Sequence, residues 1–260
     1  MGNYWAEIAD KNQTDQQLRF LKTQLKPDEW ILDLACGTGR HSIPLVKNGF
    51  GMVGLDISAR LLDIAKHHYR DIALVRADMM FLPFKPQAFS AAVSMDTSFG
   101  YLPNEKDDAV SLAEIRRTLR REGALIVDVF NRKQLMRKYN TTKNSRARLW
   151  LLPFFLKSHN RLSTWLLFRL FNWKEYPSFF LLQKRTISQK GERLCDLWVV
   201  YDKVSGGIMV FQHVVRLYVL NKLESLLEKA NFKINQVYGG YDGEGFSASS
   251  TQLILLAIAQ

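Results

Sequence analysis

The stretch ILDLACGTGR, residues 31–40, begins as an apolar run and then turns abruptly into two glycines that flank a threonine. The apolar part predicts a buried strand, Trp30–Leu34, and the glycines predict a loop that leads into a helix. Backbone N–H groups at such a turn lie at the carboxyl edge of a parallel sheet, where ligands of α/β proteins bind. The stretch therefore predicts an α/β fold with a ligand site at its first strand-to-helix turn.

Two common ligand loops fit this turn poorly. A dinucleotide loop needs a third glycine for close helix packing, and Ser42 stands at that position. A phosphate-binding loop needs a lysine followed by Ser or Thr after its last glycine, and neither is present. What remains is an acid, Asp33, four residues before Gly37, followed by the Gly-Thr-Gly turn.

Short apolar runs alternate with helical stretches through residue 130, which is typical of βαβ units. The expected strands cover residues 30–34, 52–55, 73–76, 89–95 and 124–130, with helices over 41–48, 59–69 and 105–120. Farther along the chain we expect a helix over 220–230 and strands over 233–238 and 252–259. The alternation predicts a doubly wound, mostly parallel sheet.

Acids recur at the carboxyl ends of the next two strands. Asp56 ends the second strand, where a carboxylate accepts hydrogen bonds from a ribose diol. Asp78 follows the third strand, where we expect it to accept from an exocyclic amine while Met79 covers a purine face. Three acids at successive strand ends predict a pocket for an adenosine that carries a cationic rather than a phosphate group.

These residues resemble the class I S-adenosylmethionine-dependent methyltransferases, in particular the small-molecule branch with a DLACGTGRHS loop. The motifs DLACGTGR, GLDIS, ADMMFLPF and FSAAVSMDTSFGYL arrive in the order that this family shows. The likeness covers about residues 4–131 and resumes at Arg216. It implies a Rossmann-like, doubly wound, seven-stranded sheet whose last strand is antiparallel, with S-adenosylmethionine as the cofactor.

The resemblance also implies roles for individual residues. Asp33 and the backbone of Ala35, Gly37, Thr38 and Gly39 would face the methionine part of the cofactor. The ribose would lie on Asp56 beside Ile57, the adenine between Asp78 and Met79, and the sulfonium beside Met95 and Asp96. Two departures stand out, because Glu122-Gly123 replaces the usual Gly-Gly and Asp96 stands where many relatives carry an apolar residue.

The implied reaction is an in-line displacement at the methyl carbon, which proceeds largely by positioning and desolvation. A general base helps when the acceptor is a hydroxyl, and the candidates are Asp96, Tyr101, His213 and Tyr241. We expect His41, His67 and His68 on solvated helix surfaces. No Cys, His or Asp cluster has the spacing of a metal site.

The net charge of +11 is concentrated in one segment. Residues 132–193 hold 15 basic and two acidic side chains, or +13, and the rest carries 21 basic against 23 acidic ones, or −2. We therefore expect a cofactor-binding core over 1–131, a basic and aromatic insertion over 132–193, and a return to the core over 194–260. In this last part, a hairpin is expected around Ser205-Gly206-Gly207.

Three interpretations of the insertion stay open. It forms a lid over the pocket, it contacts an anionic membrane surface through residues 146–186, or it binds nucleic acid. Its longest apolar run, Leu149–Leu156, contains Pro153 and is far short of the ~20 residues that span a bilayer. The aromatic composition favours a small, hydrophobic or lipid-like methyl acceptor.

Two other functions stay open, and the cysteine content and the N-terminal sequence bear on the location of the protein. The alternatives are a methyltransferase-like scaffold without turnover and a methyltransferase acting on nucleic acid. The chain has only two cysteines, Cys36 and Cys195, and its N-terminal residues lack the apolar stretch of a secretory signal. We therefore expect a cytoplasmic protein, with peripheral membrane association as an open alternative; the sequence predicts no oligomeric state.

Overall fold

The computed structural model describes residues 4, 7–139 and 172–260. Contacts divide the chain into two units, one made of the described parts of Gly2–Gln134 and Tyr218–Gln260 and the other of those of Leu135–Leu217. The first unit carries a seven-stranded sheet and the second a four-stranded sheet. The helix α6 (Arg132–Lys138) lies at the boundary in the sequence.

The seven-stranded sheet confirms the predicted Rossmann-like fold. Its strand order is β10-β11-β5-β4-β1-β2-β3. β1 pairs in parallel with both β2 and β4, and β11 runs antiparallel to both of its neighbours. The strands are β1 (Trp30–Leu34), β2 (Gly51–Asp56), β3 (Ala73–Arg76), β4 (Phe89–Ser94), β5 (Leu119–Phe130), β10 (Phe232–Tyr238) and β11 (Gln252–Ala259).

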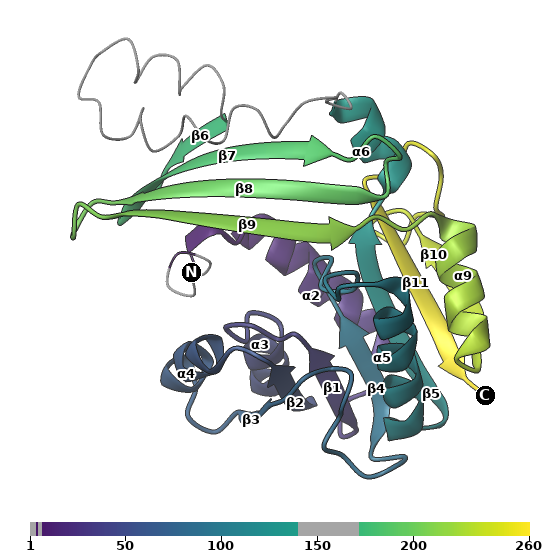
Figure 1. Cartoon of the computed structure of the whole chain (residues 1–260). Helices are drawn as coiled ribbons and strands as arrows, with labels where there is room; N and C mark the ends of the chain where they lie inside the picture. The colour runs from purple at the N-terminus through teal and green to yellow at the C-terminus, as the bar shows by residue number, and fades with distance from the viewer. Residues whose placement is uncertain (1–3, 5–6, 140–171) are drawn as a thin grey trace. The chain divides into compact units, whose positions relative to one another are not determined.

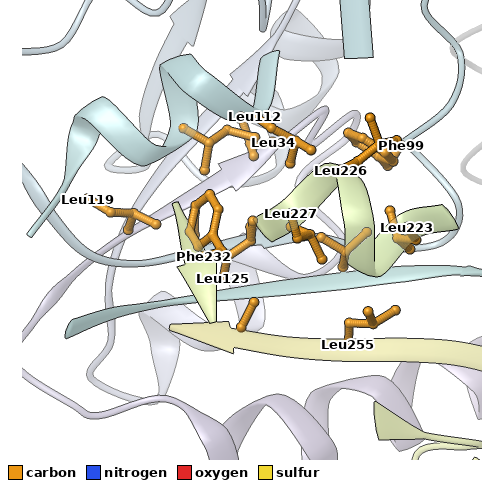
Figure 2. Close-up of a cluster of buried hydrophobic side chains, with 14 of the residues drawn as sticks. Leu34, Phe99, Leu112, Leu119, Leu125, Leu223, Leu226, Leu227, Phe232 and Leu255 are labelled. Carbon is orange, nitrogen blue, oxygen red and sulfur yellow. The ribbon is translucent and has the colours of Figure 1, made fainter. Parts of the chain in front are cut away.

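Helices pack on both faces of this sheet (Figure 1). One core cluster joins the sheet to α5 (Glu105–Thr118) and α9 (Leu220–Lys229), and Figure 2 shows the leucines of these helices packed together with Phe99 and Phe232. A second cluster joins the opposite face to α2 (Lys11–Gln24) and α3 (Ser42–Lys47). The helix α4 (Ala59–His68) begins after its N-cap Ser58, whose hydroxyl accepts from Leu61 N at 3.3 Å. The sheet is thus covered on both sides, and its strand ends remain as the place for a ligand.

Several boundaries differ from the expected ones. The helix predicted over 105–120 ends at Thr118, and β5 begins at Leu119 rather than at residue 124. The register between β4 and β5 shifts after Phe89, and Glu122 takes a left-handed φ of 61° at this irregularity. The helix α2 is not predicted at all, because it is mostly polar and buries only Gln17, Phe20 and Leu21 among its residues.

The second unit contains an antiparallel sheet of order β6-β7-β8-β9. Its strands are β6 (Asn172–Glu175), β7 (Phe179–Ile187), β8 (Arg193–Asp202) and β9 (Ile208–Arg216). The predicted hairpin around Ser205-Gly206-Gly207 is confirmed as β8–β9, with Gly206 at a φ of 67°. β6 and β7 lie in the predicted insertion and are not predicted from the sequence. The three-part division at residues 131 and 193 stays a prediction.

Much of the basic insertion lies outside the described residues, including the apolar run Leu149–Leu156 and most of 146–186. Within residues 4, 7–139 and 172–260, no helix has both the length and the apolar character needed to cross a bilayer.

Candidate functional site

A cavity of about 400 Å³ lies in the first unit at the carboxyl ends of β1, β2, β3 and β4. Its wall carries one guanidinium, that of Arg40, and four carboxylates, those of Asp33, Asp56, Asp78 and Asp96. The surplus of acids gives the cavity a negative potential when they are ionised, which favours a cationic ligand over a phosphate.

The glycine loop forms the floor between β1 and α3. Gly37 and Gly39 both take left-handed conformations, with φ of 57° and 75°. A Cβ at Gly37 would meet nothing within 4 Å, whereas one at Gly39 would lie 2.9 Å from Ile43 Cδ1. Gly37 therefore leaves room for a ligand, and Gly39 allows the helix to pack closely.

Ser42 replaces the third glycine of a dinucleotide loop and has a polar role of its own. Its hydroxyl donates a hydrogen bond to Oδ2 of Asp33, and both side chains are buried. Burial raises the pKa of Asp33 to about 6, against the opposing effects of this hydrogen bond and of Arg40. Asp33 is therefore a buried carboxyl whose charge depends on the groups around it.

Asp56 at the end of β2 connects two loops. Its Oδ2 accepts from Gly37 N at 2.9 Å, and its Oδ1 accepts from Ser58 N at 2.8 Å. Each oxygen keeps a further lone pair, so the carboxylate is oriented and still able to accept from a diol. The exposed Ile57 side chain follows it along the cavity wall.

The loop after β3 carries Asp78 and Met79, which both line the cavity. Asp78 Oδ1 accepts from Met80 N at 2.9 Å, which closes a tight turn. Arg117 on α5 donates to the carbonyls of Phe84 at 2.7 Å and Leu82 at 2.8 Å. The helix α5 therefore anchors the far end of this loop.

Asp96 follows β4 in a left-handed conformation, with φ of 54°, and Thr97 repeats it with φ of 60°. The Asp96 carboxylate, 34% exposed, lies 2.9 Å from Nη2 of Arg40. Its backbone N–H donates to Oδ2 of Asp128 at 3.0 Å, and that of Thr97 donates to the Asp128 carbonyl at 2.9 Å. Such backbone conformations cluster at functional sites, because the surrounding structure must hold them in place.

His41 is buried, so its expected place on a solvated surface was wrong. Its Nε2 lies 2.9 Å from Oε1 of Gln17, and the side chain is only 5% exposed. Burial and the nearby Arg40 lower its pKa well below the usual value, so the ring is neutral at pH 7. His67 and His68 are exposed at the end of α4, as predicted.

The cavity collects most of the residues predicted to bind a cofactor. Among them, Asp33, Ala35, Gly37, Thr38, Asp56, Ile57, Asp78, Met79 and Met95 line it. Gly39 is not among the described lining residues, and its conformation supports the turn instead. The roles implied for these residues remain predictions.

The four candidate bases are not gathered at one place in the first unit. Asp96 and Tyr101 line the cavity, and Tyr241 is absent from the described lining residues. The Tyr241 hydroxyl donates to Oδ2 of Asp128 at 2.7 Å, and burial together with Asp128 raises its pKa, so it stays protonated. A phenol in that state is a donor rather than a base.

His213 belongs to β9 in the second unit. It pairs across the strands with Asp196, and its ring meets Trp198 edge-on at 5.3 Å between centroids. Burial lowers its pKa, against the opposing effect of Asp196. Its catalytic role stays a prediction.

Sequence reasoning missed three residues around the cavity: Arg40, Gln17 and Asp128. Asp128 lies in the apolar run IVDVF of β5, and an acid within such a run near a strand end was the available signal. Arg40 directly follows the glycine loop. Gln17 gave no signal, because its role depends on how α2 packs.

Within residues 4, 7–139 and 172–260, no three His, Cys, Asp or Glu side chains lie together as metal ligands would.

Comparison with known proteins agrees with this geometry. The family model of a methyltransferase domain matches residues 31–123, which run from β1 into β5. Demethylmenaquinone methyltransferase from Corynebacterium kroppenstedtii is 41% identical over 106 residues, which cover 41% of this chain and 44% of that protein. The chain thus matches about half or less of the length of such curated relatives.

Solved structures share the fold over nearly the whole chain. The CcbJ methyltransferase from Streptomyces caelestis has a TM-score of 0.76 at 16% identity, covering 97% of this chain and 92% of its own. The sugar N-methyltransferase KedS8 from a Streptoalloteichus species has a TM-score of 0.63 at 17% identity, covering 99% and 91%. With the matched domain and the seven-stranded sheet, the chain contains a methyltransferase domain and shares the Rossmann-like fold of S-adenosylmethionine-dependent methyltransferases.

Proposed function

We propose that this chain binds S-adenosylmethionine in the cavity at the strand ends and transfers its methyl group to a small acceptor molecule. The observation that carries the proposal is the convergence of Gly37, Asp56 and Asp78 on one cavity from three separate turns. These residues come from three different motifs of the sequence, so their convergence is a property of the fold rather than of any one motif.

The residues fit such a ligand. The space beyond Gly37 is open where a Cβ would point, and four carboxylates face one guanidinium around the cavity. Asp56 is fixed by two backbone N–H groups and keeps lone pairs for a ribose diol. Met79 lies beside Asp78 on the wall, where a thioether packs well against an aromatic base.

When bound, the cofactor supplies an electrophilic methyl carbon on a sulfonium. The residues of the chain then orient the acceptor and exclude water, and such positioning lowers a barrier by up to roughly 7–11 kcal/mol in well-oriented cases. Asp96 and Tyr101, which line the cavity, are the residues that we propose to contact the acceptor. Asp96 accepts a proton or a hydrogen bond from an acceptor that carries an O–H or N–H group.

For the acceptor, we propose a small hydrophobic, lipid-like molecule. The β4 side of the cavity carries Met95, Tyr101 and Leu102, and Tyr101 is 49% exposed. Apolar side chains at that end suit an aromatic or aliphatic acceptor. The name of the demethylmenaquinone methyltransferase relative is consistent with this class.

The basic insertion supports a further part of the proposal. The +13 charge of residues 132–193 would attract the protein to an anionic membrane, where a lipid-like acceptor is found. Co-sedimentation with phosphatidylglycerol vesicles at low salt, weakened at high salt, tests this part. Recovery of all the protein in the supernatant at low salt would remove the membrane from the proposal and favour a lid.

Calorimetric titration with S-adenosylmethionine tests cofactor binding. We expect saturable binding in the native chain and at least about a tenfold loss in Asp56→Ala, because the oriented carboxylate is gone. The exposed Asp63→Ala on α4 is the matched control and should bind like the native chain. Equal binding by all three proteins would remove the assignment of Asp56.

Turnover is tested by transfer of labelled methyl to a panel of acceptors. The panel contains a demethylated naphthoquinol, an amino sugar and a mixed RNA, which represent lipid-like, polar and nucleic-acid acceptors. Transfer to the naphthoquinol supports the proposed acceptor class, and transfer to another member alone contradicts it. Binding of the cofactor without transfer to any member would favour a scaffold that lacks turnover.

A further inference from the structure

A buried chain of hydrogen bonds links α2 to the β4 end of the cavity. Gln17, fully buried on α2, donates from Nε2 to the Tyr241 hydroxyl at 2.8 Å. Tyr241 in turn donates to Oδ2 of Asp128 at 2.7 Å, and the same oxygen accepts from Asp96 N at 3.0 Å. Three segments that are distant in the sequence therefore converge behind one strand end.

The same glutamine also holds the other partner of Asp96. Its Oε1 accepts from Nη1 of Arg40 at 2.9 Å, and Nη2 of that guanidinium lies 2.9 Å from Oδ2 of Asp96. Asp96 is thus restrained twice, at its backbone through Asp128 and at its carboxylate through Arg40. Both restraints meet in the single amide group of Gln17.

These hydrogen bonds hold an unfavourable backbone conformation at Asp96 and Thr97. Asp96 and Thr97 both lie in the left-handed region, which is unfavourable for an L-residue. Asp128 accepts the N–H of each of them, one through its carboxylate and one through its carbonyl. A well-packed strand end needs no such arrangement for stability alone, so the conformation indicates that the direction of the Asp96 side chain matters.

The sheet order defines where Asp96 points within the cavity. β4 lies on one side of β1, and β2 and β3 lie on the other, so Asp96 and Asp78 belong to opposite ends of the cavity wall. If the adenosine lies over β2 and β3, as the proposed function holds, the methyl-bearing end faces β4. An inference about Asp96 therefore concerns the place where the acceptor meets the methyl group.

We propose that Gln17, Asp128 and Tyr241 are positioning residues that hold Asp96 in the direction needed at the methyl-bearing end of the cavity. The inference rests on the proposed function, because it takes that end from the proposed pose of the cofactor. It makes α2, a mostly polar helix, a functional part of the site. None of the three residues needs to touch cofactor or acceptor.

The test uses S-adenosylmethionine labelled with ¹³C at the methyl group, whose resonance in the bound state reports the surroundings of that carbon. Tyr241→Phe removes only the hydroxyl that links Gln17 to Asp128. Its matched control is Tyr238→Phe, which removes a hydroxyl that donates to Gln24 at 3.3 Å between the same helix and β10. Both rings pack edge-on against Phe20, and phenylalanine keeps the ring at either position, so the two variants differ from the native chain only by a hydroxyl.

We expect Tyr241→Phe to move the bound methyl resonance and Tyr238→Phe to leave it in place. Asp96→Asn should also move it, and adding Tyr241→Phe to that variant should move it little further, since both changes act through one side chain. Should Tyr241→Phe not fold, Gln17→Met removes the bond to Tyr241 together with the bond to Arg40, and it should also move the resonance. Thermal unfolding of each variant shows that the comparison is made on folded protein.

Two results would overturn the inference while leaving the proposed function intact. In one, the bound resonance is the same in the native chain, Tyr241→Phe and Tyr238→Phe. In the other, both tyrosine variants move it equally, which would make the contact of α2 with residues 238–241 a packing feature only. A native chain that yields no bound methyl resonance would instead contradict the proposed function itself.

Discussion

The Ser42 hydroxyl donates a hydrogen bond to the buried carboxylate of Asp33, so the residue that breaks the dinucleotide pattern is bonded to the acid that begins the loop. This contact opposes the effect of burial, which by itself raises the pKa of Asp33. A hydrogen bond from a hydroxyl stabilises the ionised form of a carboxyl group. Ser42 therefore helps to keep negative charge under the glycine loop.

Ser42→Ala should weaken binding of S-adenosylmethionine at neutral pH by roughly fivefold, equivalent to about 1 kcal/mol for one lost hydrogen bond. The pKa of Asp33, about 6 in the native chain, should rise in the variant. The pH at which affinity falls on acidification should therefore move upward. Calorimetric titrations from about pH 5.5 to about pH 8 measure both effects, since the window brackets that pKa.

The control for this change is Ser111→Ala on α5. Ser111 is also fully buried, and its hydroxyl has no hydrogen-bond partner among the described residues. We expect its affinity and pH profile to match those of the native chain. A parallel weakening in both serine variants would mean that general loosening of the fold, rather than the charge of Asp33, governs affinity.

The sequence was sufficient for the strand ends but not for what lies behind them. Asp33, Asp56 and Asp78 could be found because each lies at or just after the carboxyl end of an apolar strand, and a parallel sheet brings such ends to one edge. Gln17 and His41 could not, because their burial depends on the packing of a polar helix against the loop. Periodicity reports which residues face a core, and a helix held mainly by polar contacts gives little periodic signal.

From a distance, Arg117 should control the side of the cavity that Asp78 and Met79 line. Its guanidinium donates to the carbonyls of Leu82 and Phe84, and its neighbour Glu114 accepts from Leu82 N at 3.0 Å. Arg117→Met removes these donors, so residues 78–84 should exchange amide hydrogens faster. Affinity for S-adenosylmethionine should fall by roughly threefold to tenfold, because the ligand must then order the loop.

Arg116→Met is the neighbouring control, because that guanidinium donates to the carbonyls of Leu119 and Gln260 instead. Hydrogen exchange in 78–84 and affinity should both stay native in this variant. If Arg117→Met leaves exchange in the loop unchanged, the anchoring role given to α5 is wrong.

Asp128→Asn should make the ligand-free protein more stable in alkaline solution. Burial raises the pKa of Asp128 to about 7, so the folded state holds its proton more tightly than the unfolded state does. The contribution to stability is present at acid pH and is lost as the pH rises through about 7. Asparagine keeps an oxygen for Tyr241 and Asp96 and carries no charge that must be buried.

The expected gain in free energy of unfolding is on the order of 1 to 3 kcal/mol near pH 8 and close to none near pH 4. Denaturant unfolding at the two pH values measures it, and the exposed Asp63→Asn should change stability at neither. A loss of stability that is larger at pH 8 than at pH 4 would show that hydrogen bonding to the ionised carboxylate outweighs its burial.

Gly37 and Gly39 should separate binding from folding, because they share a left-handed backbone but differ in their surroundings. Alanine at either position pays roughly 1–2 kcal/mol for that backbone. In Gly39→Ala the new methyl group also meets Ile43 at 2.9 Å and Ala65 at 3.4 Å, so the helix must shift and stability should fall further.

In Gly37→Ala the methyl group enters open space at the cavity wall. Affinity for S-adenosylmethionine should therefore fall by more than about tenfold, with the smaller loss of stability. Denaturant unfolding and calorimetric titration of the same two proteins give both quantities, and a Gly37→Ala variant that binds like the native chain would mean that the ligand does not approach this loop.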